Sequence, residues 1–173
     1  PVTFYKSVDE LPHFKDYTMD GRTYRYFKGE PLYSFGFGLS YSTFVYKNIH
    51  VPPSSKTGSE VKISVDVTNT GKMGGEEVVQ VYVTDQEASA PVPLRSLAAF
   101  TRVFLKAGET KKVEIVLPAD KFSLIDKELN RVIEPGKFSI TVGGKQPGVA
   151  LPSDSSLVQA ELELTGKSYP MND

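Results

Sequence analysis

Three pairs of neighbouring acidic residues are the first candidates for general acid–base chemistry in this 173-residue chain. Two carboxylates in different surroundings can divide the roles of acid and base between them. Each pair, however, lies in or beside an expected turn or at the end of an expected strand, where a solvated carboxylate is the usual outcome. We therefore expect all three pairs to be solvated and non-catalytic: Asp9/Glu10, Glu76/Glu77 and Asp126/Glu128.

Other residues that carry chemistry are sparse. His13 and His50 are the only histidines and are too isolated to predict a metal cluster. Cysteine is absent, which excludes disulfides and thiolate chemistry and leaves the redox compartment open. Gly36-Phe-Gly38 lacks the third glycine of a dinucleotide loop, and no Gly-x-Ser-x-Gly elbow occurs. We expect no catalytic residue, no cofactor and no metal site.

The stretch from Leu32 to Phe44 holds five aromatic residues and two glycines in thirteen positions. Aromatic rings bury large areas and need partners, and the glycines allow turns or close backbone approaches. Two interpretations fit these residues: an ordinary loop at the edge of a local core, or an interface segment that joins two modules. The rings concerned are Tyr33, Phe35, Phe37, Tyr41 and Phe44.

A second unusual segment, residues 19–27, interleaves arginine with tyrosine. Arg22 and Arg25 alternate with Tyr24 and Tyr26, an arrangement suited to bidentate hydrogen bonding and ring stacking. These four side chains could border a binding cleft, or they could pin the segment by ion pairs and packing.

From Thr43 onward the sequence takes the two-residue period of half-buried strands. The clearest strand is Val61–Thr68, in which four β-branched residues alternate with polar ones. Turn residues separate it from the alternation of Val79–Val83, and we expect these two strands to pair antiparallel. The other expected strands are Leu97–Leu105, Val113–Leu117, Phe122–Asp126, Arg131–Ile133, Lys137–Val142 and Val158–Leu164, the last of them at a sheet edge.

Seven or eight short strands without an amphipathic helix predict an all-β fold. We expect a two-sheet sandwich of the immunoglobulin or fibronectin type III-like kind, with an irregular N-terminal extension. A closed barrel is the alternative that alternation alone does not exclude. A turn or single helical turn is expected at Ala119–Lys121. Pro12 and Gly21 interrupt residues 1–30, which cannot make a core of their own.

Charge and hydropathy exclude some classes of partner. The formal net charge is −1, and lysine and arginine are scattered, so the chain lacks the basic patch of a protein that binds nucleic acid or an anionic membrane. No apolar run reaches the roughly eighteen residues of a membrane span. We expect neither nucleic acid nor a membrane as a partner.

Several motifs in a fixed order resemble the carboxy-terminal region of family 3 glycoside hydrolases. The downstream motifs continue in the same order, and one departure is Ala98-Ala99 before Phe100, where that family often has Lys-Gly. The resemblance covers nearly the whole chain. Its motifs are Gly21–Phe27, Glu30–Tyr33, Phe35–Tyr41, Val67–Gly71, Gly75–Val83, Arg102–Leu105, Ala107–Glu109, Glu134–Gly136 with Phe138, and Val142–Gly144.

The resemblance implies an enzyme of three parts: a barrel domain with an aspartate nucleophile, an α/β sandwich domain with a glutamate acid/base, and a trailing fibronectin type III-like domain. This chain is similar to the third part. Residues 1–30 would be the last piece of the α/β domain with its linker, Pro1–Tyr5 being a severed strand, and residues 31–173 would be the β-sandwich. None of the acidic pairs matches a catalytic motif of the family.

The function that follows from the resemblance is a non-catalytic module that stabilises the catalytic domains of the same polypeptide. It would dock through the five rings of the Leu32–Phe44 stretch, while Arg22, Tyr24, Arg25 and Tyr26 could lie near the cleft wall. The parent would be a retaining β-glucosidase or β-xylosidase, with a periplasmic or extracellular location suggested by the family alone.

Two other functions are kept open. One is an autonomous enzyme. The other is a carbohydrate-binding module with polysaccharide as its partner, because exposed tyrosines can stack on sugar faces. The candidate rings are Tyr17, Tyr24, Tyr26, Tyr33, Tyr41, Tyr46, Tyr82 and Tyr169.

Overall fold

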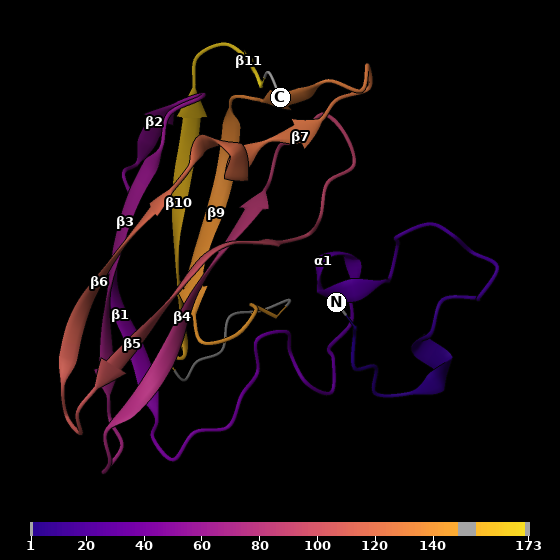
Figure 1. The fold of residues 1–173 in the computed structure, drawn as a ribbon. Coiled ribbons are helices and arrows are strands. Elements are labelled where there is room, and N and C mark those ends of the chain that lie inside the picture. Colours follow the sequence, from indigo (N-terminus) through magenta and orange to yellow (C-terminus); the bar gives the residue numbers. More distant parts are fainter. Residues whose placement is uncertain (1, 149–154, 172–173) are drawn as a thin grey trace.

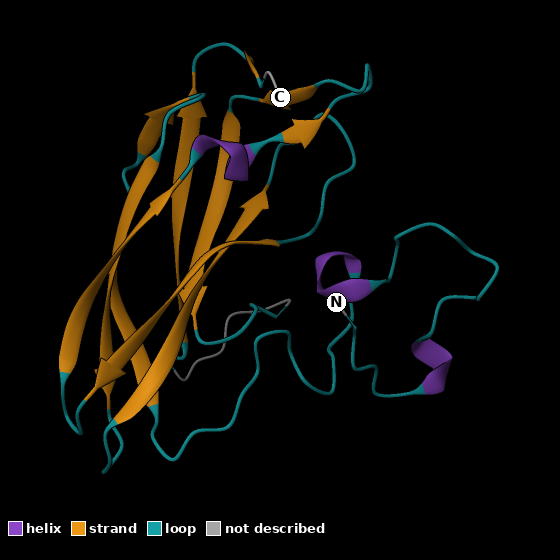
Figure 2. Cartoon of the chain, in the orientation of Figure 1, coloured by secondary structure: helices purple, strands orange, loops and turns teal. Residues whose placement is uncertain are grey.

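The computed structural model describes residues 2–148 and 155–171, and most of the regular structure in them is β (Figures 1 and 2). Two sheets face each other. One has three strands in the order β1-β3-β6, and the other has five in the order β2-β10-β9-β4-β5. The strands are β1 (Phe44–His50), β2 (Ser54–Lys56), β3 (Val61–Asn69), β4 (Gly75–Asp85), β5 (Ser96–Leu105), β6 (Thr110–Leu117), β9 (Gly136–Gly143) and β10 (Leu157–Thr165).

The core lies between the two sheets. Alternate residues of β3, such as Val65 and Val67, share one buried cluster with Val79 and Val81 of β4 and Ile140 of β9. Such alternation places one face of each strand in the core and the other outward. The two sheets share no strand pair within the described residues, so the predicted sandwich is confirmed and the barrel alternative is wrong.

The expected pairing of the Val61 and Val79 strands is wrong. β3 pairs with β1 and β6, whereas β4 pairs with β5 and β9 in the other sheet. The turn-rich segment between them crosses from one sheet to the other. The alternation of a strand reports its buried face, and two strands that face each other across a core show the same pattern as two that pair.

The last predicted strand is not at the sheet edge. β10 pairs antiparallel with β9 from Leu157 to Leu164, and on its other side the short β2 adds three residues in parallel. β2 escaped prediction because three polar residues carry no alternation. The outer positions of this sheet are therefore held by β2 and β5.

A small third sheet, in the order β11-β8-β7, lies at one end of the sandwich (Figure 1). The helical turn expected at Ala119–Lys121 is confirmed as the 3-10 helix η2 (Ala119–Phe122). The predicted strand Phe122–Asp126 is shorter in the structure, where only Leu124–Ile125 form a strand, β7. Phe122 belongs to η2 instead, and its ring is buried in the core. The other strands of this sheet are β8 (Arg131–Ile133) and β11 (Tyr169–Pro170).

Residues 2–43 form an irregular arm beside the sandwich (Figure 1). Its regular elements are the 3-10 helix η1 (Val8–Glu10) and the single-turn α1 (Thr23–Tyr26). The predicted severed strand is reduced to one antiparallel bridge between Phe4 and Tyr33, and Pro1 lies outside the described residues. Only Tyr24 and Phe27 are buried in this arm, which agrees with an extension that has no core of its own.

Candidate interdomain docking site

The end of the arm is fixed to the outer face of the five-stranded sheet by three aromatic rings. Val79, Val81 and Val83 of β4 point into the core, so the Tyr82 side chain lies on the opposite face. There the ring of Tyr24 stacks on Phe35, with centroids 4.1 Å apart and planes at 10°, and meets the ring of Tyr82 at 6.2 Å and 78°. We call Tyr24, Phe35 and Tyr82 the aromatic clamp.

A buried amide network holds the backbone beside the clamp. Gln80 Nε2 donates to the carbonyls of Gly144 at 2.8 Å and of Gly36 at 3.4 Å, and Tyr82 Oη donates to Gln80 Oε1 at 2.6 Å. Burial, followed by the proximity of Tyr24, raises the pKa of Tyr82, so its hydroxyl stays a proton donor. Through Gln80, the network joins the arm to β4 and to the residue that follows β9.

Gly36 is required where the arm crosses β4. Its φ is +81°, in the left-handed region, and a Cβ atom there would collide with the amide of Gln80. Gly38, in contrast, has nothing within 4 Å of the equivalent position. Two reciprocal bonds close the crossing: Phe35 N–H donates to Gln146 Oε1 at 3.2 Å, and Gln146 N–H donates to the Phe35 carbonyl at 2.8 Å.

The five rings predicted to dock lie in different environments, some buried and some exposed. Phe44 is buried in the sandwich core, and Phe35 belongs to the clamp. Tyr33 and Phe37 are half exposed with ring centroids 5.3 Å apart, and Tyr41 is 97% exposed. Docking against another domain therefore stays a prediction for the three exposed rings.

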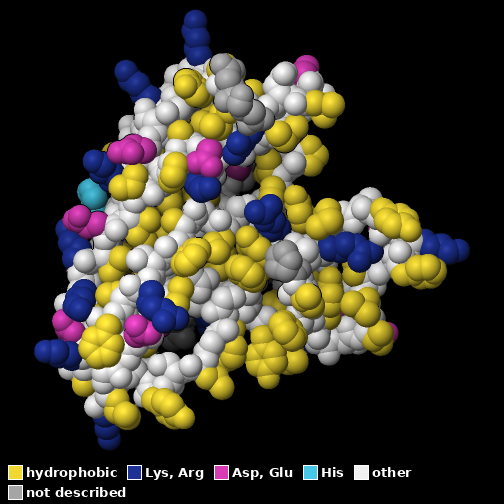
Figure 3. Space-filling model, in the orientation of Figure 1, with side chains coloured by type: hydrophobic (Ala, Val, Ile, Leu, Met, Phe, Trp, Pro, Cys, Tyr) yellow, Lys and Arg dark blue, Asp and Glu magenta, His cyan; other side chains and the backbone are white. Residues whose placement is uncertain are grey.

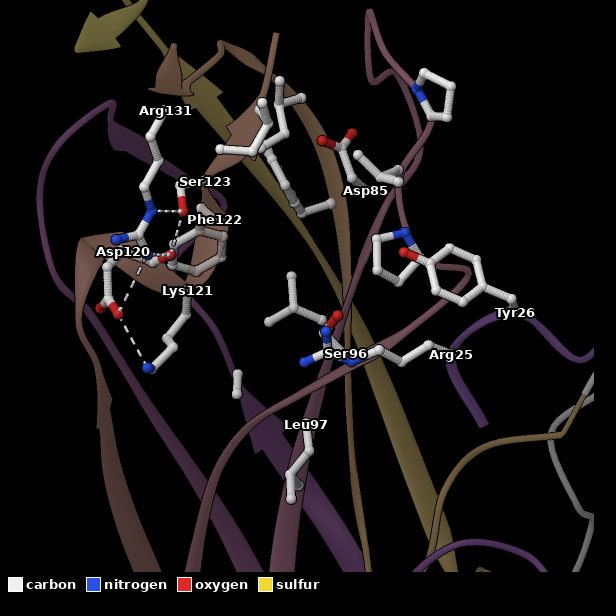
Figure 4. Close-up of a pocket in the computed structure, with 18 residues that line it drawn as sticks. Arg25, Tyr26, Asp85, Ser96, Leu97, Asp120, Lys121, Phe122, Ser123 and Arg131 are labelled. Carbon is white, nitrogen blue, oxygen red and sulfur yellow. Dashed lines mark hydrogen bonds and ion pairs between the residues drawn. The ribbon is translucent and has the colours of Figure 1, made fainter. Parts of the chain in front are cut away.

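The four residues predicted to lie near a cleft also occupy different places, and only two of them line one. The guanidinium of Arg22 donates to the carbonyls of His13 and Asp16 at 3.2 and 2.6 Å, and to that of Thr18 at 3.2 Å, so it pins the arm. Tyr24 is in the clamp. Arg25 and Tyr26 line a cleft at the end of the sandwich (Figure 4).

Large apolar side chains gather on the surface of the arm (Figure 3). Isolated exposed apolar residues are ordinary, but a cluster of this kind on one segment marks an interaction surface. Its exposed members are Val2, Phe4, Val8, Leu11, Phe14, Tyr17, Met19, Leu32, Tyr33, Phe37, Leu39 and Tyr41.

Three of the eight tyrosines considered for sugar stacking are unavailable, because Tyr24, Tyr46 and Tyr82 are buried. The remaining candidates are divided between the arm, the mouth of the cleft and β11.

The expectation that both members of the Glu76/Glu77 pair are solvated is wrong for Glu77. Its carboxylate accepts a 2.7 Å hydrogen bond from Tyr46 Oη on the inner side of the sheet, while Glu76 faces outward and pairs with Arg102 at 2.9 Å. Burial raises the pKa of Glu77, although the bond from Tyr46 opposes that shift. Glu77 lies two residues before Val79 in β4, and alternate residues of a strand share a face. This spacing is the sequence signal that indicates its inward orientation.

Within residues 2–148 and 155–171, no three metal-ligating side chains come together. The helices in the same residues are all too short to cross a membrane.

Residues 77–146 match the family model described as a fibronectin type III-like domain. Residues 77–146 therefore belong to a fibronectin type III-like domain. It is 42% identical over 144 residues to a β-xylosidase of Formosa agariphila, and 35% identical over 156 residues to the periplasmic β-glucosidase of Salmonella typhimurium. Each match covers 83% of this chain but only 19% and 20% of the relative, so the chain spans about a fifth of their length.

Solved structures give the same result. The β-glucosidase of Listeria innocua in complex with glucose superposes with a TM-score of 0.70 at 35% identity, over 80% of this chain and 18% of the other. A β-glucosidase of Erythrobacter marinus reaches 0.74 at 29% identity, over 95% and 21%. The resemblance of this fibronectin type III-like domain to part of β-glucosidases and β-xylosidases is confirmed.

Proposed function

We propose that this domain is a non-catalytic docking module of a larger β-glycosidase, in which it packs against the catalytic domains of the same polypeptide and stabilises them. The observation that carries the proposal is the division of the linker aromatics. Phe35 is fixed to the domain's own sheet, while Tyr33, Phe37 and Tyr41 remain exposed. One side of the linker is thus ordered by the sandwich, and the other side offers apolar surface to a second domain.

The clamp gives this docking a defined direction. Gln146 bonds the backbone of Phe35 and Gln80 bonds the carbonyl of Gly36, so the exposed rings leave the sheet at a set position. A preorganised surface loses less conformational entropy when it is covered than a mobile one does. The parent would hydrolyse β-linked glycosides, as the names of the relatives indicate, with its catalytic carboxylates in the other domains.

The test uses the full-length polypeptide that contains this chain. Replacing Tyr33, Phe37 and Tyr41 together by serine should lower its melting temperature, its soluble yield and its activity on nitrophenyl β-glycosides. The matched control replaces Phe100 and Phe104 by serine, since both are exposed on β5.

The control should behave as wild type. Equal melting temperatures and activities for wild type, the triple variant and the control would contradict docking through the linker rings.

A further inference from the structure

A second cavity, of about 430 Å³, lies over the outer face of the five-stranded sheet. Its floor comes from outward positions of β4, β9 and β10, where the register places Thr84 beside Ser139 and Thr141 beside Gln159. The segment that precedes β5 contributes Arg95 to the lining. The volume lies in the range of small-ligand sites in proteins.

The charged side chains in the described lining of this cavity are both cations, Lys28 and Arg95. Lys28 is exposed and already pairs with Asp20, with 3.2 Å between Nζ and Oδ1. Glu161, on β10, is exposed, accepts a bond from Gln86 Nε2 at 3.4 Å and is not part of the lining. The charge that remains to be matched inside the cavity is therefore the single positive charge of Arg95.

Arg95 is a buried cation, with only 8% of the residue exposed. Its side chain makes one hydrogen bond to the described part of the chain, from Nη1 to the carbonyl of Tyr24 at 3.4 Å, and forms no ion pair there. Burial lowers the pKa of Arg95, and the group that opposes this shift is the phenol of Tyr82 rather than a carboxylate. A buried charge without a counter-charge is costly, and most of the guanidinium donors stay available for an acceptor.

Backbone bonds hold Arg95 in position over the floor of the cavity. The preceding residue, Leu94, donates its N–H to the carbonyl of Arg25 at 2.8 Å. The carbonyl of Leu94 accepts a bond from Thr84 Oγ1 at 3.0 Å. Because the chain is fixed on both sides of this peptide unit, the guanidinium is preorganised before any ligand arrives.

The floor adds two hydroxyl groups. Ser139 and Thr141 are both buried, and neither hydroxyl makes a hydrogen bond within residues 2–148 and 155–171. Each can donate to an acceptor in the cavity, and the planar fork of Arg95 matches the two oxygens of a carboxylate. A phosphate monoester carries about two negative charges at neutral pH, whereas a carboxylate carries the one that a single unpaired cation balances.

We propose that this cavity binds the carboxylate of a small polar molecule, with the guanidinium of Arg95 as its counter-ion and the hydroxyls of Ser139 and Thr141 as further donors. The volume accommodates a whole small molecule rather than one acidic group. The amide of Gln159 offers a polar partner to the rest of the ligand. This site is separate from the exposed linker rings, and its binding activity does not depend on docking.

The experiment titrates the 173-residue chain with sodium acetate and with sodium lactate at constant ionic strength. Nuclear magnetic resonance follows the Nε–H signal of Arg95 and the amide signals of Ser139 and Thr141. Both carboxylates should shift these signals to saturation, whereas acetamide, the neutral isostere of acetate, should not. Arg95→Gln should weaken the binding about tenfold or more, because the charge-assisted hydrogen bonds are lost.

The matched control is Arg102→Gln, which removes the same charge from an exposed arginine paired with Glu76, and it should bind as wild type does. Thr141→Val keeps the shape of the side chain without the hydroxyl and should weaken binding severalfold. Amide spectra establish that each variant is folded, and Thr141→Val tests the site even where Arg95→Gln does not fold. Absence of a saturable shift with both carboxylates, or binding that neither cavity variant weakens, would overturn the proposal.

Two further outcomes would identify a different occupant. Tighter binding of inorganic phosphate than of either carboxylate would make the cavity a phosphate site. If none of these probes binds but Arg95→Gln lowers the melting temperature of the full-length polypeptide, an acidic group of a neighbouring domain supplies the counter-charge. The proposal of a small carboxylate is wrong in both cases, while docking through the linker rings is tested separately by its own variants.

Discussion

The sandwich and the N-terminal arm contain similar apolar residues but treat them in opposite ways. Between the two sheets, Leu105 and Leu117 are fully buried. In the arm, Leu39 is 93% exposed and only two side chains are buried. The difference indicates that the sandwich gains folding free energy from its own core, whereas the arm leaves most of its apolar surface exposed in this chain.

The largest difference in the free energy of unfolding should appear when leucine is replaced by alanine once in the sandwich and once in the arm. Leu105→Ala removes a fully buried side chain and should lower the free energy of unfolding by about 2–5 kcal/mol, since it leaves a cavity in the core. Leu39→Ala should change it by less than about 0.5 kcal/mol in this chain. Urea denaturation of both variants measures the difference, and similar losses would mean that the arm contributes to the core.

A smaller loss of unfolding free energy is expected where the arm meets the sandwich. Gly36→Ala forces a Cβ into the amide of Gln80 at a left-handed φ and should cost about 1–3 kcal/mol, with faster hydrogen exchange at the Phe35 and Gln146 amides. Gly38→Ala is the control, because nothing lies near its Cβ position. Equal exchange rates in the two variants would show that the clamp does not depend on the crossing at Gly36.

A pH-dependent effect on stability is expected at Glu77 in the sandwich. The raised pKa of Glu77 means that the folded chain keeps this proton to higher pH than the unfolded chain, so stability is lost as pH rises above the ordinary value of 4.5. Glu77→Gln should remove this loss and become more stable than wild type at neutral pH, with no such gain below pH 4.5. Tyr46→Phe should enlarge the loss, because the hydrogen bond that stabilises the carboxylate is gone.

Chemical denaturation at a series of pH values measures both changes. Parallel stability curves for wild type and Glu77→Gln would contradict the assignment.

The smallest effect on global stability is expected in the arm. Arg22→Lys keeps the charge but loses the planar fork that reaches three backbone carbonyls. Residues 13–18 should become more sensitive to limited proteolysis, while the unfolding free energy of the sandwich stays within about 0.5 kcal/mol of wild type. A matching drop in sandwich stability would show that the two regions unfold as one unit.

The sequence predicts the class of fold better than the partners of its strands. Alternation in Val61–Thr68 and Val79–Val83 identifies two buried faces, and the sandwich follows from several such faces with turns between them. The pairing does not follow, because β3 and β4 lie in different sheets and contribute to the same core without pairing by hydrogen bonds. Only long-range geometry decides between those two arrangements.

Residue type alone also does not predict which linker rings are packed and which are exposed. Phe35 and Phe37 are the same residue two positions apart, yet one is stacked on Tyr24 and the other is half exposed. What separates them is the crossing at Gly36 over Gln80, a contact between residues 44 positions apart. Glu77 differs, because its place in the alternation of β4 was visible in the sequence.

The bonds between Phe35 and Gln146 join residues separated by 111 positions. During synthesis on the ribosome, the rings of the linker emerge long before the strand that precedes Gln146, and contacts of such high sequence separation form late in folding. We expect the nascent linker to remain an open apolar segment through most of translation. The hazard of premature association is therefore greatest at the beginning of the chain, although its most stable structure lies further along.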